Sequence, residues 1–117
     1  GQYCSSVNNC YLNVVDKAQI RGAVTCLSVP GGGYCTHTCT TDADCCFAQN
    51  ECRSGFSQVC SPFTSTGQNY CFLSCDAATV AAIGAPSDSA FCQQYASPAF
   101  TCRSTGGGAA NEKVCAP

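Results

Sequence analysis

Hydrophobic residues occur in short groups along the chain, and neither a long apolar run nor a sustained helical period is present. The clearest helix candidate is the segment 76–84, because its alanines favour a helix. Gly84, followed by Pro86, is a typical helix end. Ser74 or Asp76 is the expected cap at the start of this helix, since either side chain can accept hydrogen bonds from free backbone N–H groups.

Three other segments have weaker helical patterns. A helix is predicted over residues 13–22, with Asn13 as the candidate cap and Gly22 at the end. Single helical turns are predicted over residues 41–44 and 87–90, because their Ser, Thr and Asp side chains are suited to capping.

Two β-hairpins are predicted, each around a turn that contains glycine. The expected strand pairs are residues 50–53 with 57–60, around Gly55, and residues 100–103 with 113–115, around Gly106, Gly107 and Gly108. The remaining residues are predicted to be loops. The pattern therefore indicates β-hairpins and irregular loops, with one or two short helices.

Cysteine content sets the fold class. The 117 residues include fourteen cysteines: Cys4, Cys10, Cys26, Cys35, Cys39, Cys45, Cys46, Cys52, Cys60, Cys71, Cys75, Cys92, Cys102 and Cys115. An even number at this density in a short chain is typical of a small disulfide-rich fold, and disulfides persist in oxidising compartments. We therefore expect every cysteine to be bonded, in a thermostable, secreted, extracellular protein whose signal peptide has been removed.

The cysteine spacing also indicates an internal repeat. Tyr-Cys pairs with a glycine shortly before them end at Cys4, Cys35 and Cys71. Two further motifs recur, namely Cys-Arg-Ser at 52–54 and 102–104 and Val-Cys-x-Pro at 59–62 and 114–117. These matches predict a single compact domain built of a partial module 1–30 and two related modules, 31–62 and 63–117.

The middle module resembles the inhibitor-cystine-knot miniproteins, or knottins. It has six cysteines, with the adjacent pair Cys45-Cys46 in the middle, and a predicted closing hairpin. The knottin order of pairing implies the bonds Cys35–Cys46, Cys39–Cys52 and Cys45–Cys60. In the third module Gln93 stands where the second cysteine of the pair would be, so at least one bridge is expected to join two modules.

Charge and hydropathy exclude two classes of partner. The net charge is −2, and the five basic residues are spread along the chain, so the clustered basic surface of nucleic-acid-binding proteins is absent. No apolar stretch approaches the ~20 residues that cross a bilayer, so no membrane insertion is expected. We expect a monomer.

Candidate catalytic and metal-binding residues are few. His37 is the single histidine, and no nucleophile or orienting partner is evident near it, so we expect no catalytic residues and no enzyme. Asp42 and Asp44 could begin a calcium loop, but Cys45-Cys46 interrupts the pattern and helix capping is favoured. Zinc is disfavoured because clustered cysteines of secreted chains oxidise. No metal or other cofactor is expected.

The candidate binding residues are Arg53, Phe56, Phe63 and Arg103. Each arginine directly follows a cysteine into a predicted hairpin loop, and the two phenylalanines are expected to be exposed in loops, where aromatic rings are good protein-binding anchors. Tyr34 and Tyr70, which precede cysteines, are expected to pack against the disulfides instead.

These features predict a non-enzymatic protein that binds an extracellular protein or receptor through rigid loops, since a cross-linked scaffold loses little entropy on binding. In size and cysteine content the chain is similar to small secreted fungal proteins, which include effectors and defence proteins. In bulk character it also resembles sweet-tasting proteins that act on a taste receptor.

The alternative is a serine protease inhibitor. The segment from Cys52 to Cys60 encloses seven residues, which resembles the reactive loop of the Bowman–Birk inhibitors. In that family the specificity residue is the second after the cysteine, which is Ser54 here, and the loop contains a Pro-Pro that this chain lacks.

Overall fold

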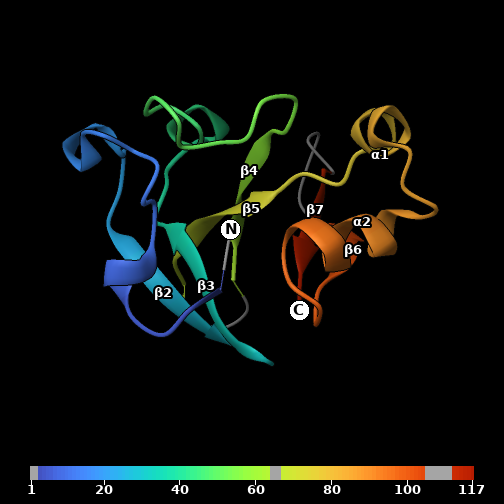
Figure 1. The fold of residues 1–117 in the computed structure, drawn as a ribbon, viewed down its shortest axis with the longest axis horizontal. Coiled ribbons are helices and arrows are strands. Elements are labelled where there is room, and N and C mark those ends of the chain that lie inside the picture. Colours follow the sequence, from blue (N-terminus) through green and yellow to red (C-terminus); the bar gives the residue numbers. More distant parts are fainter. Residues whose placement is uncertain (1–2, 64–66, 105–111) are drawn as a thin grey trace.

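The computed structural model describes residues 3–63, 67–104 and 112–117, which form three antiparallel sheets connected by short helices (Figure 1). The first sheet has the strand order β1 (Tyr3–Cys4), β3 (Gly32–His37) and β2 (Val24–Val29). The other two are hairpins of β4 (Gln58–Pro62) with β5 (Asn69–Leu73), and of β6 (Thr101–Ser104) with β7 (Lys113–Ala116). The predicted class, a small disulfide-rich fold of hairpins, loops and short helices, is confirmed.

The two α-helices lie between β5 and β6. Helix α1 (Ala77–Ile83) confirms the first prediction, with Asp76 as the N-cap and Gly84 ending the helix in the left-handed conformation at φ 79°. Helix α2 (Asp88–Tyr95) begins at the predicted turn, where the Ser87 side chain accepts a hydrogen bond from the N–H of Ala90. It is longer than the single turn expected, because Phe91 and Cys92, which follow the predicted turn, are buried in the core.

The cap of α1 gives a direct stability test. Asp76 accepts a hydrogen bond from the N–H of Thr79 at 2.7 Å, so Asp76→Ala is expected to lower the free energy of unfolding by about 1 kcal/mol. Asp76→Asn retains an oxygen acceptor and should cost less than about half of that. Urea unfolding of both variants checks this prediction, and equal losses would show that the charge rather than the cap matters.

The remaining helical segments are single 3₁₀ turns: η1 (Val7–Asn9), η2 (Lys17–Gln19) and η3 (Asp42–Asp44). The turn predicted over 41–44 is confirmed by η3. The helix predicted over 13–22 is wrong, because only η2 forms there, with Asp16 rather than Asn13 as its cap. Its apolar residues are instead drawn into a small cluster, in which Val14 and Ile20 pack with Ala48.

One hairpin prediction is confirmed and the other is wrong. Strands β6 and β7 pair as expected, while the turn at 106–108 lies outside the described residues. The segment 50–53 does not pair with 57–60. Strand β4 pairs with β5 instead. Cys52 forms a disulfide with Cys46, which closes residues 46–52 into a tight loop and keeps them out of the sheet.

All fourteen cysteines are bonded, as predicted, in seven disulfides. The pairs are Cys4–Cys26, Cys10–Cys35, Cys39–Cys60, Cys45–Cys71, Cys46–Cys52, Cys75–Cys102 and Cys92–Cys115. None of the bonds implied by the knottin resemblance is present: Cys35, Cys39 and Cys45 all bond to other partners.

Six of the seven disulfides follow one repeated pattern. When Cys46 and Cys52 are left out, each group of four cysteines pairs first with third and second with fourth, and the third and fourth face each other across a hairpin. We call these groups unit 1 (4–35), unit 2 (39–71) and unit 3 (75–115). The module boundaries drawn from the sequence, after residues 30 and 62, fall inside the hairpins β2–β3 and β4–β5. Cys46–Cys52 is the one bond outside the pattern and belongs to unit 2 alone.

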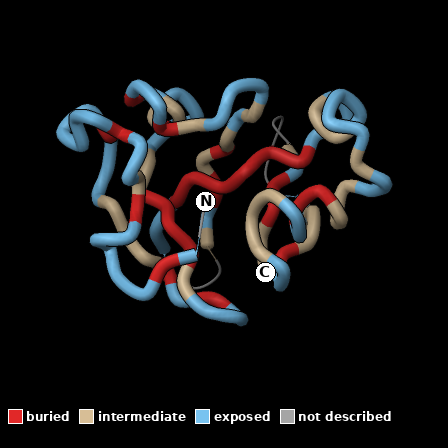
Figure 2. The backbone as a smooth tube through the Cα atoms, in the orientation of Figure 1, coloured by how far each residue is buried: buried red, intermediate tan, exposed pale blue. Residues whose placement is uncertain are grey.

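The three units share one aromatic core. The ring of Tyr34 stacks on Phe72 at 5.8 Å and contacts Phe100 at 4.8 Å, so it joins rings from all three units. Tyr34 and Tyr70 are both buried. The longest fully buried stretch runs from Tyr70 to Cys75, along β5 and toward α1, through the middle of the molecule (Figure 2).

Candidate binding cleft

A cleft of about 220 Å³ lies where the three units meet. Its lining residues are Tyr11, Leu12, Asn13, Cys35, Asn50, Glu51, Cys52, Arg53, Phe56, Gln58, Leu73 and Tyr95. Apart from Cys35 and Leu73, they come from the segments between the second and third cysteine of each unit. Equivalent segments of the three units therefore converge on one site, and we call this site the cleft.

The backbone around the cleft adopts uncommon conformations. Tyr11, Cys46 and Asn50 have positive φ, at 56°, 66° and 67°, and they are the only non-glycine residues to do so in the part of the chain that the structure describes. Tyr11 and Cys46 each follow the second cysteine of a unit, and Tyr11 and Asn50 line the cleft. Strained backbone of this kind clusters at functional sites, where the surrounding structure holds it in place.

A buried ion pair supports the wall of the cleft. The Nε2 atom of His37 lies 2.7 Å from Oε2 of Glu51, and neither side chain has exposed surface. The other ring nitrogen, Nδ1, donates to the carbonyl of Thr38 at 2.8 Å. Glu51 also accepts from the N–H groups of Cys46 and Ala48, at 2.9 and 3.2 Å. His37 therefore has a partner after all, fourteen residues further along the chain.

This geometry sets the charges of both groups. Burial alone would lower the pKa of His37, but the hydrogen bonds to Glu51 and Thr38 and the carboxylate charge raise it above the usual value. Burial likewise favours a neutral Glu51, yet the hydrogen bonds from His37 and two backbone N–H groups lower its pKa below the usual value. Both shifts favour an imidazolium paired with a carboxylate. Burial, above all, raises the pKa of Tyr11, so its hydroxyl stays neutral.

Arg53 and Phe56, both predicted as binding residues, meet at the edge of the cleft. The guanidinium carbon of Arg53 lies 5.5 Å from the ring centroids of both Phe56 and Tyr95. Phe56 is half-buried rather than fully exposed, because its ring packs on Phe91 at 5.5 Å and Tyr95 at 5.1 Å. Sequence analysis missed Tyr95, since nothing local in α2 marks it as a neighbour of Arg53.

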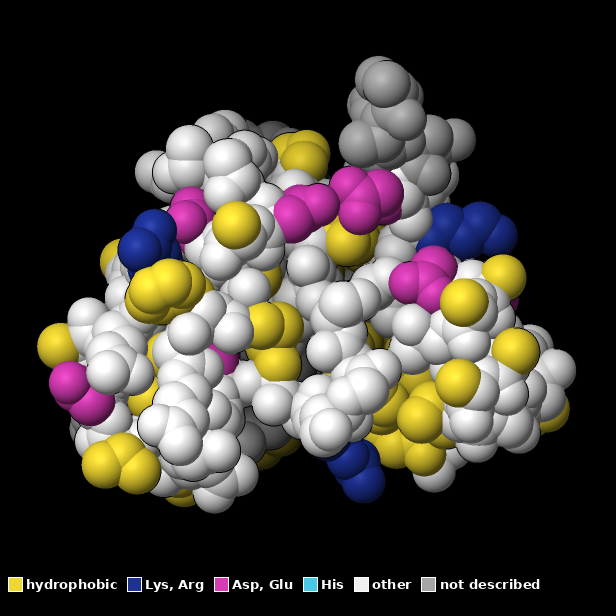
Figure 3. Space-filling view, turned by 90° about the horizontal axis from the view of Figure 1, so that it is seen from above, with side chains coloured by type: hydrophobic (Ala, Val, Ile, Leu, Met, Phe, Trp, Pro, Cys, Tyr) yellow, Lys and Arg dark blue, Asp and Glu magenta, His cyan; other side chains and the backbone are white. Residues whose placement is uncertain are grey.

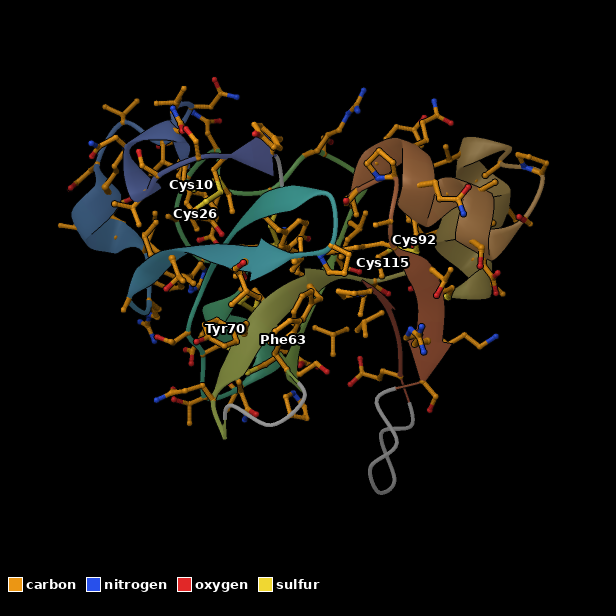
Figure 4. All side chains as sticks on the ribbon, turned by 90° about the horizontal axis from the view of Figure 1, so that it is seen from below. Cys10, Cys26, Phe63, Tyr70, Cys92 and Cys115 are labelled. Atoms are coloured by element: carbon orange, nitrogen blue, oxygen red, sulfur yellow. A yellow bond between two sulfur atoms is a disulfide. The ribbon has the colours of Figure 1, made fainter. Side chains whose placement is uncertain are left out.

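Phe63 and Arg103, the other two predicted residues, line a second pocket of about 420 Å³. Phe63 is half-buried and lies beside Tyr70 (Figure 4), with 6.5 Å between the two ring centroids. Its ring centroid lies 6.0 Å from that of Phe72. Arg103 is exposed. The four residues therefore belong to two different surfaces, one at the cleft and one beside β4, β5, β6 and β7.

The ring on which the inhibitor alternative depends is absent. Cys52 bonds to Cys46 and Cys60 bonds to Cys39, so the segment between Cys52 and Cys60 is not closed by a disulfide. The resemblance to the Bowman–Birk reactive loop therefore has no counterpart in the bonding.

The candidate metal ligands have other partners. In each unit the sulfurs of the first, second and fourth cysteine lie within 4.8 Å of one another, but all of them are in disulfides. Asp44 accepts hydrogen bonds from the N–H groups of Thr40 and Thr41, which is the predicted capping. Asp42 does not cap, because its Oδ1 accepts from the N–H of Cys60 at 2.8 Å.

Surface charge is sparse. On the face drawn in Figure 3, the basic side chains stand apart from one another and form no continuous patch. In the described ranges no helix has both the length and the apolar character needed to cross a membrane. Comparisons with protein families, curated proteins and solved structures found no match to this chain.

Proposed function

We propose that this chain is a secreted, non-enzymatic binding protein that engages an extracellular protein or receptor through the cleft. The observation that carries the proposal is the convergence of equivalent segments from three cross-linked units on one strained site with an exposed arginine. A receptor ligand of the effector, defence or taste-active kind fits this description. We propose that the protein binds its partner as a monomer.

Preorganisation supports this proposal. Cys46–Cys52 closes the loop 46–52, and Glu51 holds that loop from inside through His37, Cys46 and Ala48. A loop already fixed in its binding conformation loses little entropy when a partner binds, so a small contact area can suffice. This additional bond has no equivalent in units 1 and 3, which suggests that it serves the site rather than the general fold.

The cleft should lose binding when its exposed groups are removed. We expect Arg53→Ala to weaken partner binding about tenfold or more, as for an arginine that anchors an interface, with the thermal midpoint almost unchanged because Arg53 is exposed. The probe is a labelled protein screened against extracellular receptor domains, followed by titration of the best binder.

Arg103→Ala is the matched control, since Arg103 occupies the same Cys-Arg-Ser motif but lies at the other pocket. If Arg103→Ala weakens binding and Arg53→Ala does not, the second pocket is the site. Titration against trypsin and subtilisin separates inhibition from receptor binding, because stoichiometric slowing of either protease would favour the inhibitor alternative.

A further inference from the structure

The guanidinium of Arg53 is exposed and has no anionic partner within the described residues. Its central carbon lies 5.5 Å from the ring centroid of Phe56 and 5.5 Å from that of Tyr95. Contact with aromatic rings leaves the N–H groups along the edge of the guanidinium available for hydrogen bonds with a ligand. A carboxylate matches that edge with two parallel hydrogen bonds.

The charge balance of the cleft also calls for an anion. Glu51 is the one carboxylate among the lining residues, but it is buried and compensated by His37. Two of the other basic groups are occupied, since Arg21 stacks on Phe47 at 3.8 Å and Lys113 lies 3.8 Å from Asp88. Arg53 is the one Lys or Arg among the lining residues and makes no ion pair with a described residue, so a ligand carboxylate would neutralise its charge.

Two free carboxamides complete the site. Asn13 and Asn50 line the cleft together with Arg53, and the same three residues also line a pocket that shares its wall with the cleft. Both side chains are exposed, and neither makes a hydrogen bond within the described part of the chain. A carboxamide offers one acceptor and two donor hydrogens, which suits it to the peptide groups of an extended segment.

We infer that the cleft recognises an acidic peptide segment, in which Arg53 binds the carboxylate of one Asp or Glu side chain and Asn13 and Asn50 bind the adjacent peptide groups. The aromatic rings beneath Arg53 hold the guanidinium in position for this contact. This inference rests on the proposed function and specifies the chemistry of the partner at the same site.

Two small probes test the inference directly. The N-acetyl, N-methylamide derivatives of glutamate and of glutamine have nearly the same shape and differ in one charge. In NMR titrations of the ¹⁵N-labelled protein, we expect the glutamate probe to shift the side-chain N–H resonances of Arg53, Asn13 and Asn50. Its affinity should exceed that of the glutamine probe about tenfold, as expected for a charge-assisted contact. Arg53→Gln should abolish this preference, and Arg103→Gln should leave it unchanged.

The outcomes separate the inference from the proposed function. Equal binding of both probes, or no shift of these three groups by either probe, overturns the inference. A protein partner that loses affinity on Arg53→Ala but tolerates replacement of its own acidic residues would also overturn it, while leaving the proposed function in place. If the partner is unaffected by every substitution in the cleft, the proposed function itself fails.

Discussion

Replacing Cys92 and Cys115 together by alanine is expected to lower the free energy of unfolding by at least ~3 kcal/mol. This disulfide joins residues 23 positions apart, and for a loop of that length the restriction of the unfolded chain corresponds to about 3.4 kcal/mol. Both cysteines are fully buried beside the aromatic core, so the lost packing adds to the effect. Guanidinium unfolding of the oxidised double variant measures the loss.

The matched control is the double variant Cys46→Ala/Cys52→Ala. This bond joins residues only six positions apart, and both cysteines are half-buried, so the expected loss is smaller, about 2 kcal/mol. We expect the control to loosen the cleft while the three units persist. If the two double variants lose equal stability, the repeated pairing is not the framework that holds the core.

Local signals in the sequence were sufficient for several elements. Asp76 and Gly84 mark the ends of α1 because capping depends on residues within one turn. The pairing of β6 with β7 was also predictable from the strand pattern on either side of a glycine-rich segment of the sequence. These elements are set by neighbours along the chain, and their predictions hold.

The pairing of the cysteines was not predictable, because it depends on contacts between distant segments. The repeat was aligned on the Tyr-Cys pairs, which placed Cys4, Cys35 and Cys71 in equivalent positions. In the structure Cys4 is equivalent to Cys39, and both begin a segment with five residues before the next cysteine. That spacing was the signal that would have aligned unit 1 with unit 2, whereas sixteen residues separate Cys75 from Cys92 in unit 3.

Only the part of the candidate site that lies within one segment was predictable from the sequence. Arg53 and Phe56 lie three residues apart, so their proximity follows from the sequence. Tyr95 and the pair of His37 with Glu51 come from different segments, and contacts between distant parts of the chain bring them to the cleft. A search for a histidine partner among near neighbours could not have found Glu51.

Glu51→Gln should destabilise the protein strongly near pH 5.5. The substitution leaves the His37 imidazolium buried without its counterion, a change that typically costs about 3–5 kcal/mol. Both carboxylate oxygens of Glu51 accept hydrogen bonds from backbone N–H groups. In the glutamine variant the side-chain NH2 group would replace one of these oxygens and face a backbone N–H group, so one hydrogen bond would be lost. The double variant His37→Gln/Glu51→Gln is the control and should recover part of the loss, since no buried charge remains.

The pH dependence of stability identifies the pair in the wild-type protein. The folded-state pKa of His37 lies above 6.5, so its contribution is complete below that pH and is lost as the pH rises through the folded pKa. The folded-state pKa of Glu51 lies below 4.5, so its contribution is complete above that pH and is lost as the pH falls through the folded pKa. The pair therefore stabilises most between pH 4.5 and 6.5.

The change in stability above pH 6.5 is the part of the pH profile that identifies His37. At acidic pH the loss of stability is not specific to Glu51, because backbone hydrogen bonds also lower the pKa values of Asp44 and Asp76. His37 is the single histidine, and the Tyr11 hydroxyl beside it stays neutral, so a decline in stability above pH 6.5 reports on His37. Denaturant unfolding from about pH 5 to about pH 9 should show this decline in the wild type and lose it in His37→Gln/Glu51→Gln. A wild-type profile as flat as that of the double variant would mean that His37 is neutral, and the charges assigned to the wall of the cleft would then be wrong.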